Sequence, residues 1–311
     1  MKNAPILKRI QEKLVVLKKA RPFPLYLVNK LREQFSIEMN YNSNAIEGNT
    51  LTLRETMLVL QQGITVKGKS LKDHLEVKNQ AKAIEYLYDV VDSKKDIPLS
   101  EMLIRNLHSL VVQNIDGVEA GSYRTYDVRI TGSKHTPPPA FDVPHQMSDL
   151  ISWYKKNKDK LDIITLATEF KHRFVAVHPF GDGNGRVSRL ILNIILMKQG
   201  YPIVVILKND RTKYYKALQK ADKSKIDDLV LFISQAVERS LDLYIRAIKN
   251  STKENTLLSL AKIAPQTKYD AEYLGLLVRT GKVAGVKEGR NWKTSLDAVQ
   301  RYEMNLIRKK K

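Results

Sequence analysis

The chain of 311 residues contains no cysteine. This absence excludes a disulfide framework, a zinc or iron–sulfur site with cysteine ligands, and catalysis by a thiol. Long apolar runs are also missing, because the longest, 190–197 and 201–207, fall far short of the roughly 20 residues that a membrane-spanning helix needs. Near the amino terminus, Lys8, Arg9 and Glu12 stand where an export signal would be apolar. We therefore expect a cytoplasmic protein that does not contact a membrane.

Acidic side chains are comparatively few. Lys and Arg number 53 against 33 Asp and Glu, which gives a formal net charge of +20. Such a surplus favours nucleic acid, nucleotides or acidic protein surfaces as partners, although many solvated lysines alone would produce it. Apolar residues make up 43% and charged residues 28%, a composition typical of a folded globular chain, and the length suggests two or three domains.

The hydrophobic pattern predicts a mainly helical protein in three parts. Residues 1–95 form an amino-terminal helical region, residues 96–250 a helical core, and residues 251–311 a separate small unit that follows a polar linker. The expected helices span 52–60, 70–91, 98–112, 146–156, 163–177, 185–199, 213–221 and 226–249, then 257–263, 270–280 and one from about 295. Two tiny strands are expected around Gly289.

One segment of the core, 121–144, departs from the helical pattern. Val128 and Ile130 alternate with a polar residue, and a glycine and a run of three prolines follow. Alternation that ends in such turn residues predicts a short β-hairpin and loop inserted into the helical bundle.

The segment His178-Pro-Phe-Gly-Asp-Gly-Asn-Gly-Arg-Val-Ser-Arg189 carries the chemistry. Its three glycines permit positive φ angles and leave the backbone bare, so that successive N–H groups form a concave anion site just before a helix begins. Arg186 and Arg189 lie three residues apart on that helix, and each can bind phosphate oxygens with two nitrogens. Asp182 suits a Mg²⁺ ion that keeps most of its water, and His178 can act as a general base.

The alternative is a glycine-rich turn in which the histidine packs in the core and the arginines are solvated. Nine fixed positions, HPF-x-DGNGR-x-x-R, favour the chemical interpretation, and they resemble the signature of the Fic family. The similarity extends over about residues 30–250. Family members transfer AMP, or less often another phosphate-bearing group, from a nucleotide to protein hydroxyls, which implies ATP as substrate and Mg²⁺ as cofactor.

The resemblance assigns roles within the motif. His178 takes the proton from a Ser, Thr or Tyr hydroxyl of a target protein, Asp182 holds Mg²⁺, and pyrophosphate leaves after attack on the α-phosphorus. Kinase-type relatives carry Lys where this chain has Gly183, and phosphocholine-transferring relatives differ at the position of Arg189, so that AMP transfer is favoured here. The residues expected around the nucleotide are Gly181, Asp182, Gly183, Asn184, Gly185, Arg186 and Arg189, with Thr131, Gly132, Ser133, Lys134 and His135 from the hairpin, and Tyr214 and Tyr215.

Two further segments gain meaning from the resemblance. The hairpin 121–144 matches the family's flap, which aligns an extended target segment by strand addition; an ordinary surface hairpin is the alternative. One of the adjacent tyrosines, Tyr214 or Tyr215, stacks on or edges the adenine, unless both serve only packing.

The stretch Ser43-Asn-Ala-Ile-Glu47-Gly48 matches the family's inhibitory motif, here on the amino-terminal side of the core. Glu47 would pair with Arg189, occupy the arginine meant for the γ-phosphate and misalign the triphosphate. The same glutamate can also position a water molecule for removal of AMP, so the direction of catalysis stays open. Considered apart from this motif, Glu47 would be interpreted as a solvated carboxylate at a helix end.

The last unit, 251–311, resembles a winged helix–turn–helix and contains 13 Lys and Arg against six Asp and Glu. A basic unit of this kind is a candidate for DNA binding, with a packing module or a protein-docking arm as alternatives. Two functions are therefore expected from the sequence. The first is an autoinhibited protein adenylyltransferase that acts on a target protein and on itself, and the second is a DNA-binding regulator whose core senses nucleotide. A homodimer is left open.

Overall fold

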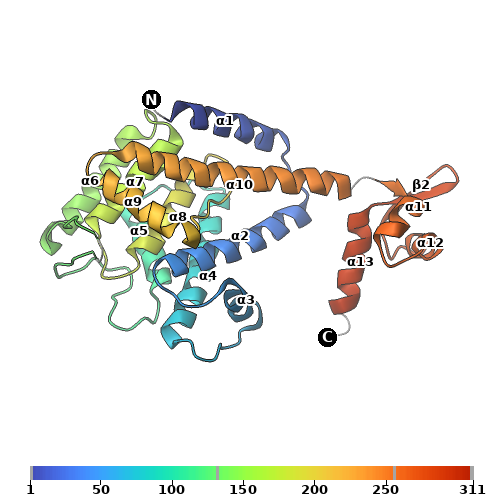
Figure 1. Ribbon diagram of the computed structural model, residues 1–311, viewed down its shortest axis with the longest axis horizontal. Coiled ribbons are helices and arrows are strands. Elements are labelled where there is room, and N and C mark those ends of the chain that lie inside the picture. Colours follow the sequence, from blue (N-terminus) through green and yellow to red (C-terminus); the bar gives the residue numbers. More distant parts are fainter. Residues whose placement is uncertain (1–2, 131–132, 255–256, 309–311) are drawn as a thin grey trace. The chain divides into compact units, whose positions relative to one another are not determined.

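The computed structural model describes residues 3–130, 133–254 and 257–308 (Figure 1). The chain folds as two compact units, one formed by residues 1–21 and 28–242 and the other by residues 22–27 and 243–311. The mainly helical class predicted from the sequence is confirmed. Within the described ranges, no helix combines the length and the apolar character that crossing a bilayer requires.

The first unit is an assembly of helices. They are α1 (Ala4–Lys19), α2 (Leu25–Ile46), α3 (Leu53–Gln62), α4 (Leu71–Asp92), α5 (Glu101–Val111), α6 (Val143–Asn157), α7 (Ile163–Val177), α8 (Asn184–Met197), α9 (Arg211–Ala221) and α10 (Ile226–Glu254), with short 3₁₀ turns at Ala140–Asp142 and Lys208–Asp210. The ends of the predicted helices differ from these by zero to five residues. α1 and α2 lie in the amino-terminal region 1–95, which the sequence predicted to be helical.

Helix α8 forms the centre of this unit. Nearly all of its side chains are buried, and it packs against α4, α5 and α7 (Figure 1). Its sequence explains this position, because Leu190–Met197 is apolar on every side and such a helix needs neighbours all around. The motif segment immediately precedes α8, so the phosphate-binding candidates stand at the start of a helix that is buried along nearly its whole length.

Local capping signals set the ends of α3. The Thr52 hydroxyl accepts from the Glu55 N–H at 3.2 Å, and the Glu55 carboxylate accepts from the Thr52 N–H at 2.7 Å, which completes a capping box. Gly63 ends the helix with φ +69°, a conformation that favours glycine. Thr52 and Gly63 thus fix the two ends of α3.

The segment 121–144 differs from its predicted form. Its described residues contain no β-strand, so the predicted hairpin is an extended loop there. The Arg124 guanidinium donates to the carbonyls of Tyr126 and Pro138, and the Asp127 carboxylate accepts from the Ala140 N–H at 2.7 Å. Side chains therefore occupy backbone groups that a strand ladder would have paired.

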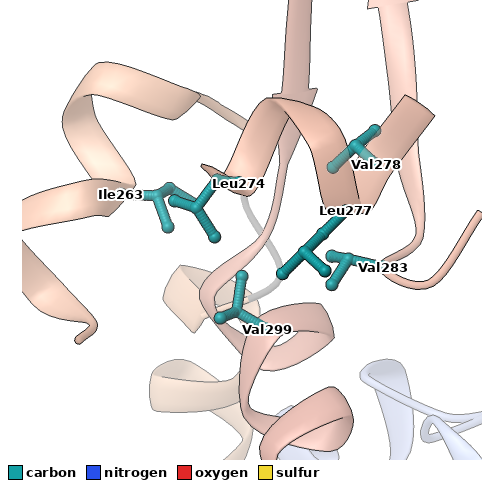
Figure 2. Packing of buried hydrophobic residues seen from close by; sticks show 6 residues of the cluster. All are labelled: Ile263, Leu274, Leu277, Val278, Val283 and Val299. Carbon is teal, nitrogen blue, oxygen red and sulfur yellow. The ribbon is translucent and has the colours of Figure 1, made fainter. Parts of the chain in front are cut away.

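The second unit combines α11 (Leu260–Ile263), a 3₁₀ turn (Ala264–Gln266), α12 (Ala271–Arg279) and α13 (Leu296–Arg308) with a small antiparallel sheet. The strands β1 (Leu258–Ser259), β2 (Gly285–Glu288) and β3 (Asn291–Thr294) lie in the order β1-β3-β2, with Leu258 opposite Thr294 and Lys287 opposite Trp292. The sequence placed β1 in a helix; it is extended because it pairs with β3. Figure 2 shows the core, to which the helices and the loop before β2 contribute Ile263, Leu274, Leu277, Val278, Val283 and Val299.

Candidate active site

His178 lies at the turn between α7 and the motif loop. It caps α7 in a left-handed conformation with φ +50°, and its N–H donates to the Phe174 carbonyl at 3.1 Å. Burial lowers the pKa of the imidazole below its usual 6.5. A half-buried imidazole of this kind is neutral at pH 7, so it has a lone pair available to accept a proton.

The loop after His178 is braced from inside. The Asn184 side chain accepts from the Phe180 N–H at 3.1 Å and donates to the Phe180 carbonyl at 2.8 Å. Both polar atoms of this 2% exposed side chain are therefore engaged with the backbone. The sequence placed Asn184 among the residues around the nucleotide, and in this structure its side chain braces the loop through the backbone of Phe180.

Phe180 anchors the same loop in the core. Its ring is fully buried and stacks on His108 of α5, with the ring centroids 3.7 Å apart. His108 Nε2 lies 3.1 Å from the Asp182 carbonyl, and burial lowers the pKa of His108 to about 4. From the other side, Arg124 Nε donates to the His178 carbonyl at 2.9 Å. Two residues that the sequence did not single out, His108 and Arg124, thus hold the turn in place.

The anion-binding cradle forms where α8 begins. Gly183 caps the helix with φ +79°, and a side chain there would press against Val112 and His108. At Gly185 an added Cβ would lie 2.0 Å from a Glu47 carboxylate oxygen. The missing side chain of Gly185 therefore leaves the space that the Glu47 carboxylate occupies beside the first turn of α8.

Glu47 reaches this position from the end of α2 and pairs with Arg189. The Glu47 carboxylate lies 2.8 Å from Arg189 Nη2, and the guanidinium also donates to the Ser43 hydroxyl at 2.9 Å and the Ser43 carbonyl at 2.8 Å. The Arg189 side chain is 3% exposed. Ser43, Glu47 and Arg189, which the sequence linked across about 140 residues, are in direct contact.

Asp182 is the carboxylate of the motif loop. Burial alone would raise its pKa, but Arg186, the Gly183 N–H and Lys72 together lower it, so the group is ionised at neutral pH. Arg186 Nη2 lies 3.4 Å and Lys72 Nζ 3.6 Å away. In the described part of the chain no three acidic or histidine side chains gather as a ready metal cage. A single exposed carboxylate fits Mg²⁺, which keeps several waters and takes its remaining oxygens from phosphates.

The loop 121–144 borders a cavity of 60 Å³ at its inner side. The cavity is lined by Ile130, Ser133, His135, Val175, Ala176, Tyr215, Leu218, Gln219 and Asp222. His135 is fixed there by a 2.8 Å contact between Nε2 and the Ala176 carbonyl. Lys134 is exposed and does not line the cavity, and the predicted residues Thr131 and Gly132 lie outside the described residues.

The two adjacent tyrosines, Tyr214 and Tyr215, differ in burial and in contacts. Tyr215 lines the cavity, whereas Tyr214 is 2% exposed and packs on Phe232 with a centroid distance of 5.6 Å. The Tyr214 hydroxyl accepts from Lys171 Nζ, a fully buried ammonium group of α7. The packing interpretation therefore fits Tyr214, and the base-side interpretation fits Tyr215. Lys171 itself had no signal in the sequence, since a lysine among apolar helix residues does not reveal its burial.

Comparisons with known proteins identify the family of this chain. The model of the Fic/DOC family matches residues 98–196. A Fic domain-containing signaling protein from Bacteroides thetaiotaomicron shares 31% identity and superposes with a TM-score of 0.70, over 79% of this chain and 97% of that one. The chain belongs to the Fic family. Residues 134–508 of Fic-1 from C. elegans share 30% identity with this chain and superpose with a TM-score of 0.73, over 80% of this chain and 73% of that one.

The curated relatives are longer proteins. A Drosophila virilis protein named Protein adenylyltransferase Fic is 36% identical over 219 residues, which is 70% of this chain and 44% of the relative. An Aedes aegypti protein of the same name is 35% identical over 234 residues, 75% of this chain and 46% of the relative. The chain thus spans less than half the length of these relatives.

Proposed function

We propose that this Fic-family chain is a protein adenylyltransferase that transfers AMP from ATP to a hydroxyl group of a target protein, and that Glu47 holds it inactive. The observation that carries the proposal is the position of the Glu47 carboxylate, over the bare backbone of Gly185 and against Arg189. A place at the first turn of a helix that holds a carboxylate against Gly185 and a buried guanidinium suits a phosphate group equally well. The names of the curated relatives support the reaction type.

In this mechanism the imidazole of His178 accepts the proton of the target hydroxyl. The oxygen attacks the α-phosphorus, the new phosphoester bond forms, and the bond between the α-phosphorus and the bridging oxygen breaks, so that pyrophosphate leaves. The amide groups of Gly183 and Gly185 and the guanidinium of Arg189 neutralise charge on the phosphates. Asp182 would hold Mg²⁺, which shields the phosphates of ATP when bound.

The extended loop 121–144 is the proposed docking segment for the target. Arg124 ties its base to the His178 carbonyl, so a peptide aligned along the loop would be registered against the imidazole. Tyr215 would border the adenine, and the adjoining cavity of 60 Å³ would have to widen to admit the base. Removal of AMP would be a separate hydrolysis at the same site: a water molecule placed by Glu47 attacks the phosphorus of the adduct, the bond to the target oxygen breaks, and AMP leaves while the target regains its hydroxyl.

The experiment compares the wild-type chain with Glu47→Gly. Labelled ATP and Mg²⁺ are supplied with a cell lysate, and AMP adducts on proteins, including the chain itself, are detected by mass spectrometry. We expect adducts with Glu47→Gly, few with the wild type, and none when His178→Ala is added. Glu33→Gln, which removes an exposed carboxylate from the same helix α2, is the matched control and should behave as the wild type. Equal labelling by the wild type and Glu47→Gly would refute the inhibitory role.

The second unit carries the alternative function as a proposal of its own. We propose that this unit is a winged helix–turn–helix, and its order of one strand, two helices and a two-stranded ribbon supports the proposal. Asp270 and the exposed Glu272 stand at the start of α12, where they would repel phosphate, whereas exposed Lys287 and Arg290 flank the β2–β3 turn. DNA binding through that turn predicts an affinity that falls steeply as salt rises. An affinity indifferent to salt would exclude it.

A further inference from the structure

The first turns of α4 fasten the chain that follows Glu47. The Asn49 side chain donates to the Asp73 carbonyl at 3.0 Å and to Glu76 Oε2 at 2.9 Å. The Asp73 carboxylate accepts from the Thr50 hydroxyl at 2.9 Å and the Thr50 N–H at 3.2 Å. The segment two residues beyond the inhibitory carboxylate is therefore anchored to one short stretch of α4.

The same stretch of α4 reaches the phosphate loop. Glu76 Oε1 lies 3.2 Å from Arg186 Nη1, and both side chains are nearly removed from solvent, with exposed fractions of 10% and 1%. Among the residues that the structure describes, the other carboxylate paired with Arg186 is that of Asp182, at 3.4 Å, whose side chain is 40% exposed. A buried guanidinium needs a buried counter-charge, and Glu76 supplies it.

We propose that Glu76 is a positioning residue whose two carboxylate oxygens join Arg186, the motif arginine expected to bind phosphates, to the segment that follows Glu47. One oxygen forms the ion pair with the Arg186 guanidinium beside the motif loop, and the other accepts the hydrogen bond from Asn49. This inference rests on the proposed function and deepens it, because it names the contact through which the position of Glu47 is registered against the loop that binds ATP.

The direction in which Glu76→Gln changes the affinity for ATP distinguishes a positioning role of Glu76 from a purely electrostatic one. Glu76→Gln removes a negative charge close to the phosphate site, and by Coulomb's law this change alone would tighten ATP binding. If Glu76 positions Arg186, the same change frees the guanidinium and weakens binding instead. A contact between charged groups of this kind corresponds to about a tenfold loss.

The first arm of the test measures ATP affinity by calorimetry in the presence of Mg²⁺, in the Glu47→Gly background. We expect Glu76→Gln to weaken ATP binding about tenfold and to raise the KM for ATP by a similar factor. Glu85→Gln, which removes an exposed carboxylate from the same helix, is the matched control and should change neither. A purely structural role would lower the melting temperature and kcat while KM stayed constant. Unchanged or tighter ATP binding overturns the proposal.

The second arm tests the link to Asn49 in the chain that retains Glu47. Asn49→Ala should raise AMP transfer about tenfold, because it releases the segment after Glu47, and should leave the KM for ATP unchanged in the Glu47→Gly background. No rise in transfer overturns the link. If Glu47→Gly binds ATP but transfers no AMP, the proposed function fails while the binding arm still decides the role of Glu76. If Glu47→Gly binds no ATP, both fall.

Discussion

The buried amine of Lys171 gives a prediction about stability that does not depend on the proposed function. Its side chain is fully buried on α7, its ammonium group donates to the Tyr214 hydroxyl, and burial together with the nearby Arg189 lowers its pKa from 10.5 to about 7, opposed by Glu47. Between these two values the unfolded chain binds a proton that the folded chain does not. The free energy of unfolding should therefore rise with pH by about 1.4 kcal/mol per unit from pH 7 upward, and should not change on this account below pH 7.

The perturbation is Lys171→Met, which keeps the volume and removes the titrating group. Between pH 6 and pH 9 the wild type should gain about 3 kcal/mol relative to this variant, because two of those three units lie above the folded pKa. Lys171→Met should accordingly exceed the wild type in stability most at pH 6, where the buried charge is fully present. The Tyr214 pKa of about 12 lies outside this window.

The assay is urea unfolding of both proteins at several pH values, followed by far-ultraviolet circular dichroism. Lys216→Met, at an exposed position of α9, is the matched control and should show no change of the stability difference with pH. The reasoning is refuted if the difference between the wild type and Lys171→Met stays constant from pH 6 to pH 9. That result would mean that the buried amine does not titrate in this range.

Three further predictions concern the loop that begins at His178. Asn184→Ala removes both contacts to the Phe180 backbone and should lower the free energy of unfolding by about 2 kcal/mol in urea titrations, whereas a loss below about 0.5 kcal/mol would contradict the bracing role. Arg124→Met should speed amide hydrogen exchange over residues 122–130, which the guanidinium now holds; unchanged exchange would show that other contacts suffice. In the Glu47→Gly background the pH at which the rate of AMP transfer falls to half should lie below 6.5, because burial lowers the pKa of His178 and loss of the nearby carboxylate lowers it further; a midpoint above 6.5 would exclude this imidazole as the base.

The sequence was sufficient to predict the features that depend only on neighbouring residues, such as the ends of helices. The capping box of Thr52 and Glu55 and the stop at Gly63 need only neighbouring residues, and the helix 163–177 was predicted with its actual bounds. The motif at His178 was recognisable because the spacing of its glycines and arginines is itself the site. The contact between Glu47 and Arg189 was accessible only through the family resemblance, because no local pattern joins residues so far apart.

The remaining features depend on tertiary partners. Strand β1 exists because β3 lies beside it, and the predicted hairpin is an extended loop because Arg124 occupies its carbonyls. Burial distinguishes Tyr214 from Tyr215, although the two are adjacent in the sequence. Glu76 is one of several acidic residues on α4, and only its distance to Arg186 sets it apart.

The central claim is that the loop after His178 binds a triphosphate once Glu47 is removed. A crystal structure of Glu47→Gly with Mg²⁺ and an ATP analogue that cannot be cleaved between the α- and β-phosphates tests it most directly. The account predicts phosphates against the amides of Gly183 and Gly185, with Arg189 released from Ser43 toward them and the α-phosphorus facing the imidazole. A loop without nucleotide at saturating analogue, or a triphosphate bound elsewhere, would contradict it.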